Sequence, residues 1–598
     1  MLPLPEVDVT LAKLKESVRV SAEGTEGEGE LNSFYAAVDR FVASGAAAAA
    51  HGEIRDLARE VAARNGAGFP GSWIEKLWLE AYLSDGNPLP ININPHFVLD
   101  SAPSSVAAAS AAATATGMLD WWAGVLAEPQ APGAYIPLER RPELMGSIEV
   151  SAWSKVMGFA RLPRTEAAQP DTAHVYDPTT DGAKLGVVCN GHYYTVEPVM
   201  ASDFSGPMPV ELLARTMEAI QDDAHSRAPG WASGTEVGVF TALPRLEWGM
   251  WRARFAASSP AAAAFLSEWD SSLFVVALDS APLSGRSMMH GMPAAGTFNR
   301  WFDKMLVAAD PSGRVGFNFE HSFLDGIVWK HMIDAAAPEL GARARASRKP
   351  GAGLPWQRHE FTLPPELAAD MRRAQEAAAA SADSVQLVEI EDERGAASLA
   401  KSLGLSPDAF VQLALQATFA AMEQGMGRAG SLRPGVYEAA TMQGFWRGRT
   451  ETIRSLTEAS VAAVWGEPLA YSGDALRAAG QAHTATIKAA MEGDGIDRHL
   501  YMLQSVAGDN GNELFSHPLL TNASRWRVST SNISSPHLGF IGFGAVDPDG
   551  LGLGYNQCAD GLRLAISGFN ASDAVNVDIF AGIFPSVLSA MIDALRKS

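Results

Sequence analysis

A histidine followed four residues later by an aspartate stands where an apolar run ends, in the segment from Glu320 to Gly326, which reads EHSFLDG. A carboxylate at the fourth position after a histidine can reach back across one turn, where it fixes the imidazole and supports its charged form. A general base needs both properties, so His321 and Asp325 form a candidate acid–base pair. A histidine near an aspartate also occurs as a purely structural pair, and the motif alone leaves both interpretations open.

The elements around this histidine alternate between buried strands and helices. Short runs of β-branched and aromatic residues predict strands at 185–188, 273–278 and 315–319. Helical spacing of apolar residues extends from Leu31 to Asn65. The alanine-rich stretch from Val106 to Leu126 predicts a buried helix, because polar residues interrupt it too often for a membrane span. This alternation predicts an α/β fold.

Length and composition predict a globular protein with more than one unit. At 598 residues, of which 47% are hydrophobic and 19% charged, the chain is too long for one ordinary core and too apolar to be disordered. Between Arg343 and Pro355 the sequence turns to Arg, Gly, Ser and Pro, which marks a candidate linker between two domains.

The charge and the cysteines exclude several partners and sites. Lys and Arg number 46 against 68 Asp and Glu, a formal net charge of −22, which disfavours nonspecific binding to nucleic acid or to anionic membranes. An anionic ligand must therefore meet a local basic pocket. The two cysteines form no CxxC motif, so no zinc site is predicted.

Familiar catalytic signatures are absent from the sequence. There is no GxSxG, no HExxH and no Gly-Lys dipeptide, which excludes the usual serine hydrolase, zincin and P-loop classes. The glycines between Gly539 and Gly544 have the wrong spacing for a dinucleotide-binding fingerprint. They predict a strand whose backbone packs closely against another element.

Several sequence blocks resemble the choline/carnitine acyltransferase family. The HxxxDG pattern at the end of a strand recurs in CoA-dependent acyltransferases, and the other blocks stand around it in the family's order. They are TFNRWFDK at 297–304, LSPDAFVQ at 405–412, YEA at 437–439, GRTETIRS at 448–455, DRHL at 497–500, STS at 529–531 and PDG at 548–550. Chance is a poor explanation for a long block that contains tryptophan, so the chain is identified as a member of this family.

The resemblance assigns the reaction to one imidazole and one hydroxyl. By resemblance, His321 takes the proton from an alcohol that attacks a thioester, and Asp325 matches the family's carboxylate. Ser531 matches the family's donor to the oxyanion that this attack creates. Without the resemblance, Asp325 can equally be a charge at a helix N-terminus, and the run that ends at Ser531 a plain strand.

Three further residues match the family's contacts with carnitine. Carnitine differs from choline by a carboxylate, and a buried carboxylate requires a cation and hydroxyl donors. Arg498 stands at the position that has the cation in carnitine enzymes and asparagine in the choline enzyme, and Thr450 and Tyr437 match its hydroxyl partners. The structural alternative for Arg498 is a solvated salt bridge.

Coenzyme A, as the acyl-carrying co-substrate, requires basic residues near its phosphates although the whole chain is acidic. Lys401 matches one family lysine. Asp408 lies in the matched block at the predicted start of a helix, where it can contact the cofactor or stabilise the helix. The second family lysine is Ala397 here, and Arg394 can substitute for it. The resemblance implies no metal and no redox cofactor.

The resemblance also implies two similar α/β domains of the chloramphenicol acetyltransferase type, with an active-site tunnel at their interface. Coenzyme A and carnitine would enter from opposite sides and meet at His321. Residues 1–94 would form a helical segment packed against the C-terminal domain, residues 95–348 the N-terminal domain with the catalytic histidine, and residues 349–598 the C-terminal domain with the contacts to coenzyme A and carnitine.

The expected function is reversible acyl transfer between acyl-CoA and the hydroxyl of carnitine, a reaction of fatty acid metabolism. Ile541 predicts a pocket for short or medium acyl groups, because family members that accept long chains tend to have glycine there. The open alternatives are the same chemistry with choline or another alcohol, an acyl-carrier-protein donor, and a binding protein without catalysis.

The expected partners are small-molecule substrates, without nucleic acid, and the chain is expected to be a monomer without a transmembrane segment. No basic n-region followed by an apolar h-region opens the sequence, and the end, Arg-Lys-Ser, is not a peroxisomal Ser-Lys-Leu address. The expected location is therefore cytoplasmic.

Overall fold

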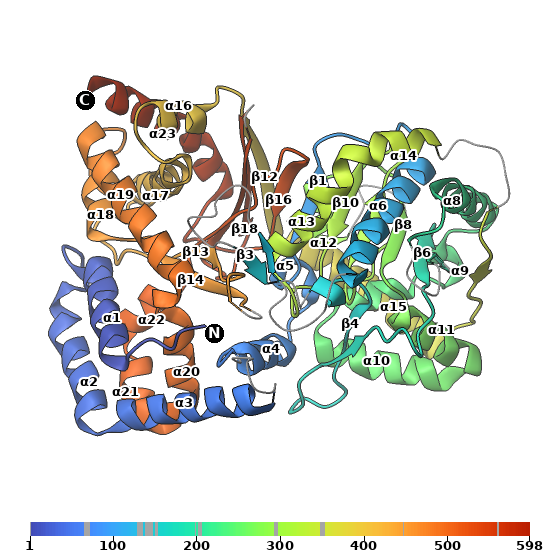
Figure 1. Cartoon of the computed structure of the whole chain (residues 1–598), viewed down its shortest axis with the longest axis horizontal. Coiled ribbons are helices and arrows are strands. Elements are labelled where there is room, and N and C mark those ends of the chain that lie inside the picture. The colour runs from blue at the N-terminus through green and yellow to red at the C-terminus, as the bar shows by residue number, and fades with distance from the viewer. Residues whose placement is uncertain are drawn as a thin grey trace.

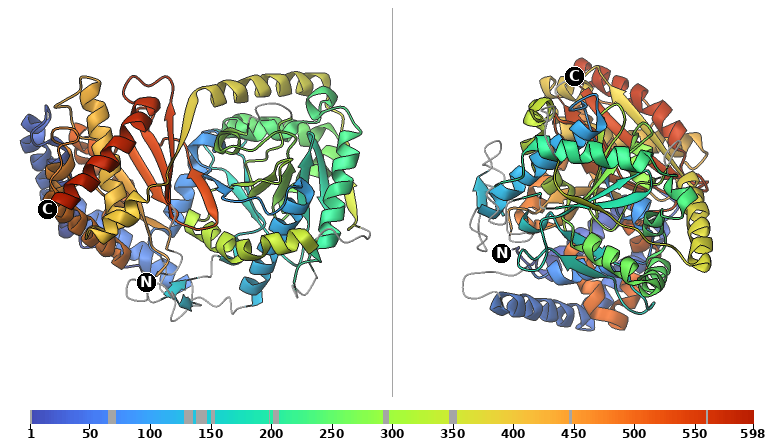
Figure 2. Two further views of the ribbon diagram at one scale, coloured as in Figure 1. Left: turned by 90° about the horizontal axis from the view of Figure 1, so that it is seen from above. Right: turned by 90° about the vertical axis from the view of Figure 1, so that its right-hand side faces the viewer.

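Two β-sheets, each covered by helices, organise the chain (Figure 1). The computed structural model describes residues 2–64, 72–127, 135–137, 147–149, 153–197, 199–200, 206–291, 297–346, 353–445, 448–558 and 561–598. Strands and helices alternate along these ranges, so the predicted α/β class with two sheet-based units is confirmed. Seen from above in Figure 2, the two units lie side by side along the long axis of the molecule.

The first sheet has eight strands in the order β11-β7-β6-β8-β9-β10-β1-β16. The β6–β8 and β8–β9 pairs are parallel, and the other pairs are antiparallel. The strands are β1 (His96–Leu99), β6 (Leu185–Cys189), β7 (His192–Val196), β8 (Val275–Leu278), β9 (Leu306–Ala309), β10 (Val315–Asn318), β11 (Trp356–Arg358) and β16 (Leu538–Gly542). Strands β6, β8 and β10 confirm the three that the apolar runs predict, and every residue in them is buried.

Helices cover both faces of the first sheet. One face packs against α6 (Ala107–Ala127), α8 (Val210–His225), α13 (Gly326–Ala336) and α14 (Leu340–Ala346). The other face packs against α10 (Arg245–Ser258), α11 (Pro260–Ser271), α12 (Gly285–His290) and α15 (Pro365–Asp383). Helix α6 confirms the buried helix predicted from the alanine-rich stretch. Its small side chains let α8, α13 and α14 approach closely.

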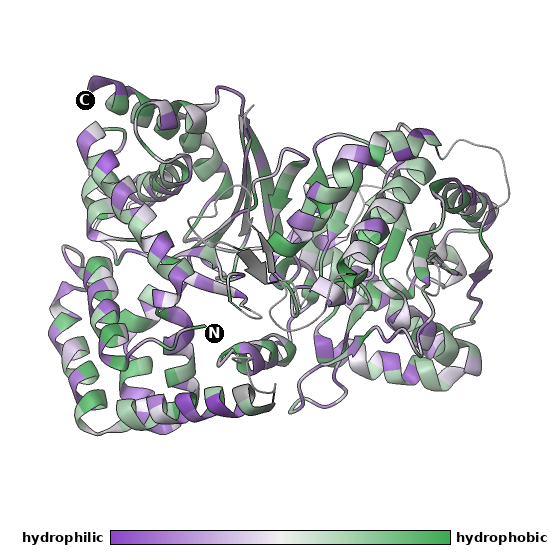
Figure 3. Ribbon diagram, in the orientation of Figure 1, coloured by the Kyte–Doolittle hydropathy of each residue, from purple (hydrophilic) through white to green (hydrophobic). Residues whose placement is uncertain are grey.

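The second sheet has six strands in the order β12-β18-β17-β15-β13-β14. These strands are β12 (Val385–Asp392), β13 (Val436–Thr441), β14 (Thr450–Arg454), β15 (Val528–Asn532), β17 (Leu551–Cys558) and β18 (Gly561–Phe569). One face is covered by α16 (Ala396–Ser402), α17 (Pro407–Gly425), α18 (Glu458–Val464), α19 (Gly473–Ala489) and α23 (Val577–Lys597). Figure 3 shows hydrophobic residues gathered on the strands of both sheets.

Helix α23 is the one described helix that is long and apolar enough to cross a membrane by length and composition. In the structure it packs against α17, α19 and β12, and Phe580, Phe584 and Leu588 are buried there. Its apolar face therefore contributes to the core of the second unit.

The N-terminal helices lie beside a segment far away in the sequence. Helices α1 (Val7–Ala22), α2 (Leu31–Ala43) and α3 (Ala46–Arg64) pack against α20 (Asp497–Ala507), α21 (Asn512–Phe515) and α22 (Pro518–Ser524), as the blue and orange helices of Figure 1 show. The helical stretch predicted from Leu31 is divided in two, because Gly45 adopts a φ of 82°. Helices α4 (Glu75–Ser84) and α5 (Leu89–Asn92) then lead to β1.

Shorter elements connect the larger ones. They are the ribbon of β2 (Tyr135–Pro137) and β3 (Ser147–Glu149), the ribbon of β4 (Phe159–Leu162) and β5 (Thr172–Val175), and the single turn α9 (Gly230–Ser233).

The two units share strands across the expected domain boundary at residues 348 and 349. Strand β16 comes from the second half of the sequence but pairs with β1 of the first sheet. Strand β11 pairs with β7, and α15 packs on the first sheet, although both follow residue 349. Of the candidate linker, residues 347–352 lie outside the described residues. By packing, the first unit therefore extends through α15 and also includes β16.

Glycines of β17 allow β16 to cross the second sheet. A Cβ on Gly554 would lie 2.5 Å from the carbonyl oxygen of Ile541, and one on Gly552 would lie 2.9 Å from that of Phe543. Such close backbone contact excludes any larger residue at these positions. The glycine-rich run from Gly539 therefore forms the closely packed strand that its spacing predicts.

A network of buried ion pairs lies below the loop that follows β10. Asp171 contacts both Arg161 and Arg245 at 2.7 Å, and Arg245 also contacts Asp303 at 2.6 Å. None of these side chains is more than 3% exposed. Arg161 Nη1 donates to Ser322 Oγ at 3.2 Å, which connects the network to the residue after His321. Asp303 belongs to the tryptophan-containing block, so part of that block serves to support this loop.

Replacing Asp303 by alanine should destabilise the protein by about 3–5 kcal/mol, because Arg245 would keep a buried charge with one carboxylate fewer. Urea unfolding measures this loss. Asp56→Ala is the matched control, since the Asp56–Arg59 pair is 71% exposed on both sides, and it should change stability by less than about 1 kcal/mol. Equal losses in the two variants would contradict a supporting role for the network.

Candidate active site

His321 lies in the loop between β10 and α13, and its ring is held by a backbone carbonyl. The Nδ1 atom lies 2.8 Å from the carbonyl oxygen of Leu324. Because a carbonyl only accepts hydrogen bonds, Nδ1 bears the proton in the neutral ring and Nε2 keeps a lone pair. The side chain is 25% exposed, so a ligand can reach it.

Aromatic rings enclose the imidazole. Tyr82 stacks on it, with ring centroids 5.6 Å apart at 26°, and Trp329 meets it edge-on at 5.5 Å. Burial lowers the pKa of His321, Asp325 opposes this shift, and Arg449 adds to it. The ring is therefore neutral near pH 7 and able to accept a proton.

Asp325 does not hold the imidazole as the four-residue spacing predicts. Its Oδ1 lies 3.7 Å from His321 Nδ1, beyond hydrogen-bond distance, and the Leu324 carbonyl takes the place next to that nitrogen. The carboxylate instead accepts two hydrogen bonds from Arg449, at 2.9 and 3.0 Å. Burial alone would raise the pKa of Asp325, but Arg449 and His321 outweigh burial and keep that pKa below its ordinary value.

Arg449 fixes the histidine loop from the other unit. It precedes β14 and also donates to the carbonyl oxygens of Ser322 at 2.6 Å and of His321 at 2.9 Å. Its guanidinium lies 5.2 Å from the centre of the Tyr82 ring. No sequence motif singles out Arg449, although this arginine directly precedes Thr450 in a matched block.

Ser531 lies on β15, close to this loop. Its hydroxyl makes no hydrogen bond to any residue in the described ranges, so the hydroxyl is available to a ligand. A Cβ on Gly326, the first residue of α13, would lie 3.1 Å from Ile533 Cδ1, two residues beyond Ser531. The end of β15 therefore packs against the start of the helix that follows His321.

The three residues predicted to bind carnitine lie together. Arg498, at the start of α20, donates from Nη2 to Thr450 Oγ1 at 3.0 Å and from Nε to the Thr450 carbonyl at 2.7 Å. The Tyr437 hydroxyl lies beside both residues, and burial raises the pKa of this phenol although Arg498 opposes the shift. The guanidinium also stacks on Trp78, 3.7 Å from the ring centre, a contact that sequence analysis missed.

Arg498 is a buried cation without an anionic partner among the described residues. The residue is 7% exposed, and no described carboxylate lies within ion-pair distance of its guanidinium. Glu451 accepts a hydrogen bond from the Arg498 backbone, but burial raises the pKa of this carboxyl to about 7 even though Arg498 opposes the shift. The solvated salt bridge considered as an alternative is therefore excluded within the described ranges, and the site favours an anion.

The two residues predicted to contact coenzyme A have different surroundings. Lys401, in the last turn of α16, is exposed. Asp408, at the start of α17, accepts hydrogen bonds from Asn532 at 2.7 Å and from Tyr555 at 2.8 Å. Asp408 thus fixes the residue that follows Ser531. Arg394, the expected substitute for a second lysine, contacts Asp392 at 2.5 Å.

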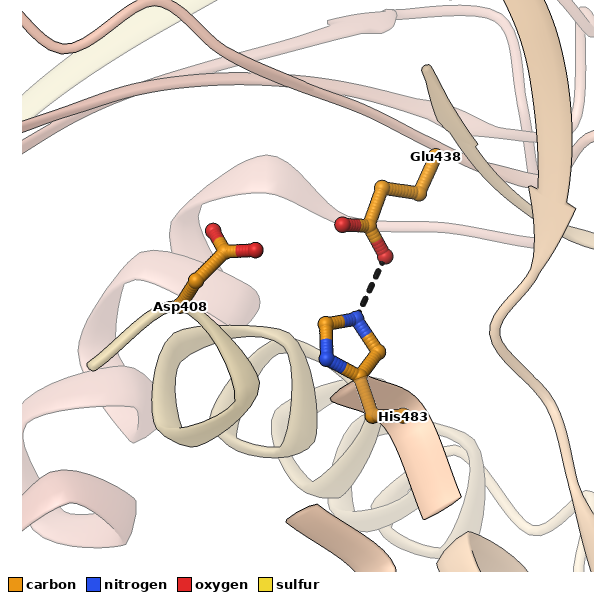
Figure 4. Close-up of side chains that lie close together, drawn as sticks. All are labelled: Asp408, Glu438 and His483. Atoms are coloured by element: carbon orange, nitrogen blue, oxygen red, sulfur yellow. Dashed lines mark hydrogen bonds and ion pairs between the residues drawn. The ribbon is translucent and has the colours of Figure 1, made fainter. Parts of the chain in front are cut away.

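A cluster of possible metal ligands lies behind β13. Asp408, Glu438 and His483 each offer a ligand atom, and these atoms lie within 4.8 Å of one another (Figure 4). His483 Nε2 and Glu438 Oε2 are 2.7 Å apart, and Ser455 donates to the same oxygen at 2.7 Å. A cation could enter only by breaking this hydrogen-bonded pair, so the cluster is better described as a buried ion pair next to a carboxylate.

A cavity lies where the two units meet. It is lined from the first unit and α4 by Glu75, Leu79, Trp153, Phe323, Leu324, Asp325 and Val328, and from the second unit by Gln443, Gly448 and Arg449. The Arg449–Asp325 pair forms part of its wall. The cavity therefore opens beside the loop that holds His321.

Sequence comparison agrees with the resemblance. The profile of the family described as Choline/Carnitine o-acyltransferase matches residues 2–584. Among curated relatives, the muscle isoform of carnitine O-palmitoyltransferase 1 from Sus scrofa is 32% identical over 416 residues, which cover 63% of this chain and 51% of the relative. The mitochondrial carnitine O-palmitoyltransferase 2 from Bos taurus is 27% identical over 582 residues, covering 88% and 82%. The chain thus spans about half the length of the first relative.

Solved structures match about half of the chain at low identity and low TM-score. A wax ester synthase/diacylglycerol acyltransferase from Marinobacter aquaeolei VT8 matches 54% of this chain and 79% of its own at 12% identity, with a TM-score of 0.27. TRI3 trichothecene 15-O-acetyltransferase from Fusarium sporotrichioides matches 56% and 79% at 13% identity, with a TM-score of 0.31. At these scores the likeness bears on neither the site nor the chemistry.

The imidazole of His321 should titrate below the ordinary histidine pKa of about 6.5. Asp325→Asn should lower this pKa further, because it removes a nearby negative charge, and Arg449→Met should raise it, because it removes a positive one. Carbon NMR of ring-labelled histidine measures the three values, with the signal assigned by its loss in His321→Gln. Shifts of the same sign in the two variants would contradict the charge arrangement.

Proposed function

Because the chain belongs to the choline/carnitine O-acyltransferase family, we propose that it transfers an acyl group between coenzyme A and the hydroxyl of carnitine. The observation that supports this most directly is the buried guanidinium of Arg498, which has two threonines and a tyrosine around it and no described carboxylate to neutralise it. A carboxylate ligand would supply the missing charge.

His321 acts as the general base in this proposal. Its Nε2 takes the proton from the carnitine hydroxyl while the oxygen attacks the thioester carbonyl. When the carbon–sulfur bond breaks, the coenzyme A thiolate leaves and receives the same proton from the imidazolium. The Leu324 carbonyl supports this role, because it holds the other ring nitrogen in its protonated state throughout.

Ser531 donates to the oxyanion that forms on the carbonyl oxygen during the attack. Its hydroxyl has no partner within the described ranges, so it can turn towards this oxygen without breaking a bond. The contacts of Asp408 with Asn532 and Tyr555 keep the end of β15 in place. In this proposal Asp408 stabilises β15, the strand that bears Ser531, from inside the protein. Lys401 contacts the phosphates of coenzyme A at the surface.

Carnitine lies with its carboxylate at Arg498, Thr450 and Tyr437. Choline has no carboxylate and would leave the buried guanidinium without a counter-charge, which is costly in a dry site. This difference favours carnitine over choline as the acceptor. A noncatalytic binding protein would have no use for the lone pair that the loop presents on His321 Nε2.

The acyl group in this proposal is short or of medium length. Ile541 is 2% exposed and pairs with Phe97 across the β1–β16 ladder. Phe97 in turn packs edge-on against Phe319, with centroids 5.1 Å apart. Large side chains therefore fill this face of β16, although the relatives named above are palmitoyltransferases.

His321→Ala should reduce the turnover of acetyl-CoA and carnitine by at least about a thousandfold, because no other described group near the hydroxyl holds a free lone pair in a fixed position. Free-thiol release measures turnover, and calorimetry measures coenzyme A binding. Binding should stay within about threefold of wild type. Turnover that survives the substitution would rule out His321 as the base.

Arg498→Asn should weaken the binding of carnitine by roughly 1.5–3 kcal/mol, because a charge-assisted contact is lost. The KM for carnitine should therefore rise about 10- to 150-fold. The KM for acetyl-CoA should stay unchanged. Arg596→Asn, a change on the exposed end of α23, is the control and should alter neither constant. If choline or another alcohol is acylated by the wild type while carnitine is inert, the assignment of Arg498 to a carboxylate fails.

A further inference from the structure

Strand β16 packs against the residue that pairs with Ser531, so an acyl tail bound at Ser531 would meet this strand. In the register of β15 and β17, Ser531 stands opposite Gly554. A Cβ on Gly554 would lie 2.5 Å from the Ile541 carbonyl oxygen and 3.2 Å from Gly542 Cα. No side chain separates these backbones, so residues 541 and 542 form the wall next to the reacting carbonyl. The role of this wall rests on the proposed function, because the acyl group that it faces belongs to that reaction.

The two faces of β16 offer different space. On one face Ile541 pairs with Phe97, whose ring packs against Phe319, and this face is filled. On the other face Gly542 pairs with His96 and contributes no side chain. An acyl tail that extends from the reacting carbonyl therefore has more space on the face of β16 that bears Gly542, which is here called the glycine face. This space stays open only if no side chain of the partner strand β1 fills it.

The ring of His96 fills that space. A Cβ on Gly542 would lie 2.6 Å from Cε1 and 2.8 Å from Nε2 of His96. A Cβ on Gly285 of α12 would lie 3.2 Å from the same Nε2. The imidazole thus lies against two glycines and occupies space that a larger residue at Gly542 would need.

Core packing does not account for a histidine at this position. The residue is fully buried, and among the described residues neither ring nitrogen has a hydrogen-bond partner. Burial, with some help from His290, lowers the pKa of His96 to about 3, so the ring is neutral. Two polar atoms that are buried without partners destabilise the fold, and an apolar ring would fill the same space without that penalty.

Beyond the ring lie the Glu389 carboxyl, which a Cβ on Gly285 would contact, and an apolar cluster. Burial raises the pKa of Glu389, which favours its uncharged form. Helix α12, which contributes Gly285, also contributes Met289, which clusters with Ile91 and Val385. Leu387 and Phe569 pack against this cluster and are only partly buried. A tail that passed the position of His96 would therefore pass beside the Glu389 carboxyl and then meet apolar side chains at the junction of the two units.

We propose that His96 is the stop that limits acyl-chain length in this protein, by filling the glycine face of β16 beside the reacting carbonyl. Ile541 closes one face of the strand and His96 closes the other. The residue is a specificity determinant: it takes no part in the chemistry, and its removal should extend the pocket from Gly542 towards Met289.

The test compares acetyl-, butyryl-, octanoyl- and palmitoyl-CoA as donors to carnitine, using wild type, His96→Ala and His96→Val. Valine keeps a β-branched side chain that suits a strand, so it tests the same opening if alanine impairs folding. Each methylene that becomes buried should raise kcat/KM about fourfold. The ratio of kcat/KM for octanoyl-CoA to that for acetyl-CoA should therefore rise at least about tenfold in both variants.

Two controls isolate the effect of the ring. His96→Phe keeps a ring of similar size, so it should keep the wild-type ratio, and it should raise the Tm because the unpartnered nitrogens are gone. His359→Ala removes another buried histidine, which follows β11 at the opposite edge of the first sheet, and should leave the ratio unchanged even if the Tm falls.

The outcomes separate this proposal from the proposed function. If folded His96→Ala and His96→Val transfer acetyl groups to carnitine with the wild-type ratio, the stop is refuted while the function stands. A ratio that rises equally in His96→Phe or in His359→Ala also refutes the stop. If the wild type acylates no carnitine with any donor, the proposed function itself fails.

Discussion

The ion pair between Arg449 and Asp325 is the contact on which the candidate site depends. It crosses from the second unit to the first, and the same guanidinium also binds the carbonyl oxygens of His321 and Ser322. A planar guanidinium presents its donors in a fixed fork, so these bonds fix both the position and the orientation of the loop. Because Thr450, the next residue, contacts Arg498, adjacent residues of the chain hold the histidine loop and the Arg498 cluster.

Buried arginines in this chain differ in whether a described carboxylate contacts them. Arg161, Arg245 and Arg300 each contact a buried carboxylate, at 2.7, 2.6 and 2.8 Å. These charges are neutralised inside the protein, and they hold the first unit together below the histidine loop. Arg498 has hydroxyls, a carbonyl and the Trp78 ring around it instead. A cation buried in this way is stable only if water solvates it or a ligand supplies the opposite charge.

Several local features were predictable because they depend on neighbouring residues. Apolar runs gave β6, β8 and β10, and an alanine-rich stretch gave α6. The order of the sequence blocks identified the family. Membership in the family indicated which residues form the candidate site, and the roles of these residues stay predictions. The spacing of His321 and Asp325 misled in one respect: it predicted a direct contact, whereas the loop places the Leu324 carbonyl beside Nδ1. The spacing shows only that the carboxylate could be near the imidazole. The backbone path of the loop decides which acceptor lies within hydrogen-bond distance of Nδ1.

The sequence by itself determined the residue types at the site and the elements that present them. Only the tertiary structure decided that Arg449 meets Asp325, that Arg498 has no carboxylate beside it within the described ranges, and that β16, from the second half of the sequence, pairs with β1. It also brought His96 against Gly542, more than four hundred residues away in the chain. The physical reason is that each of these contacts forms between segments far apart in sequence. Their meeting depends on how both sheets close around the core, which no local pattern encodes.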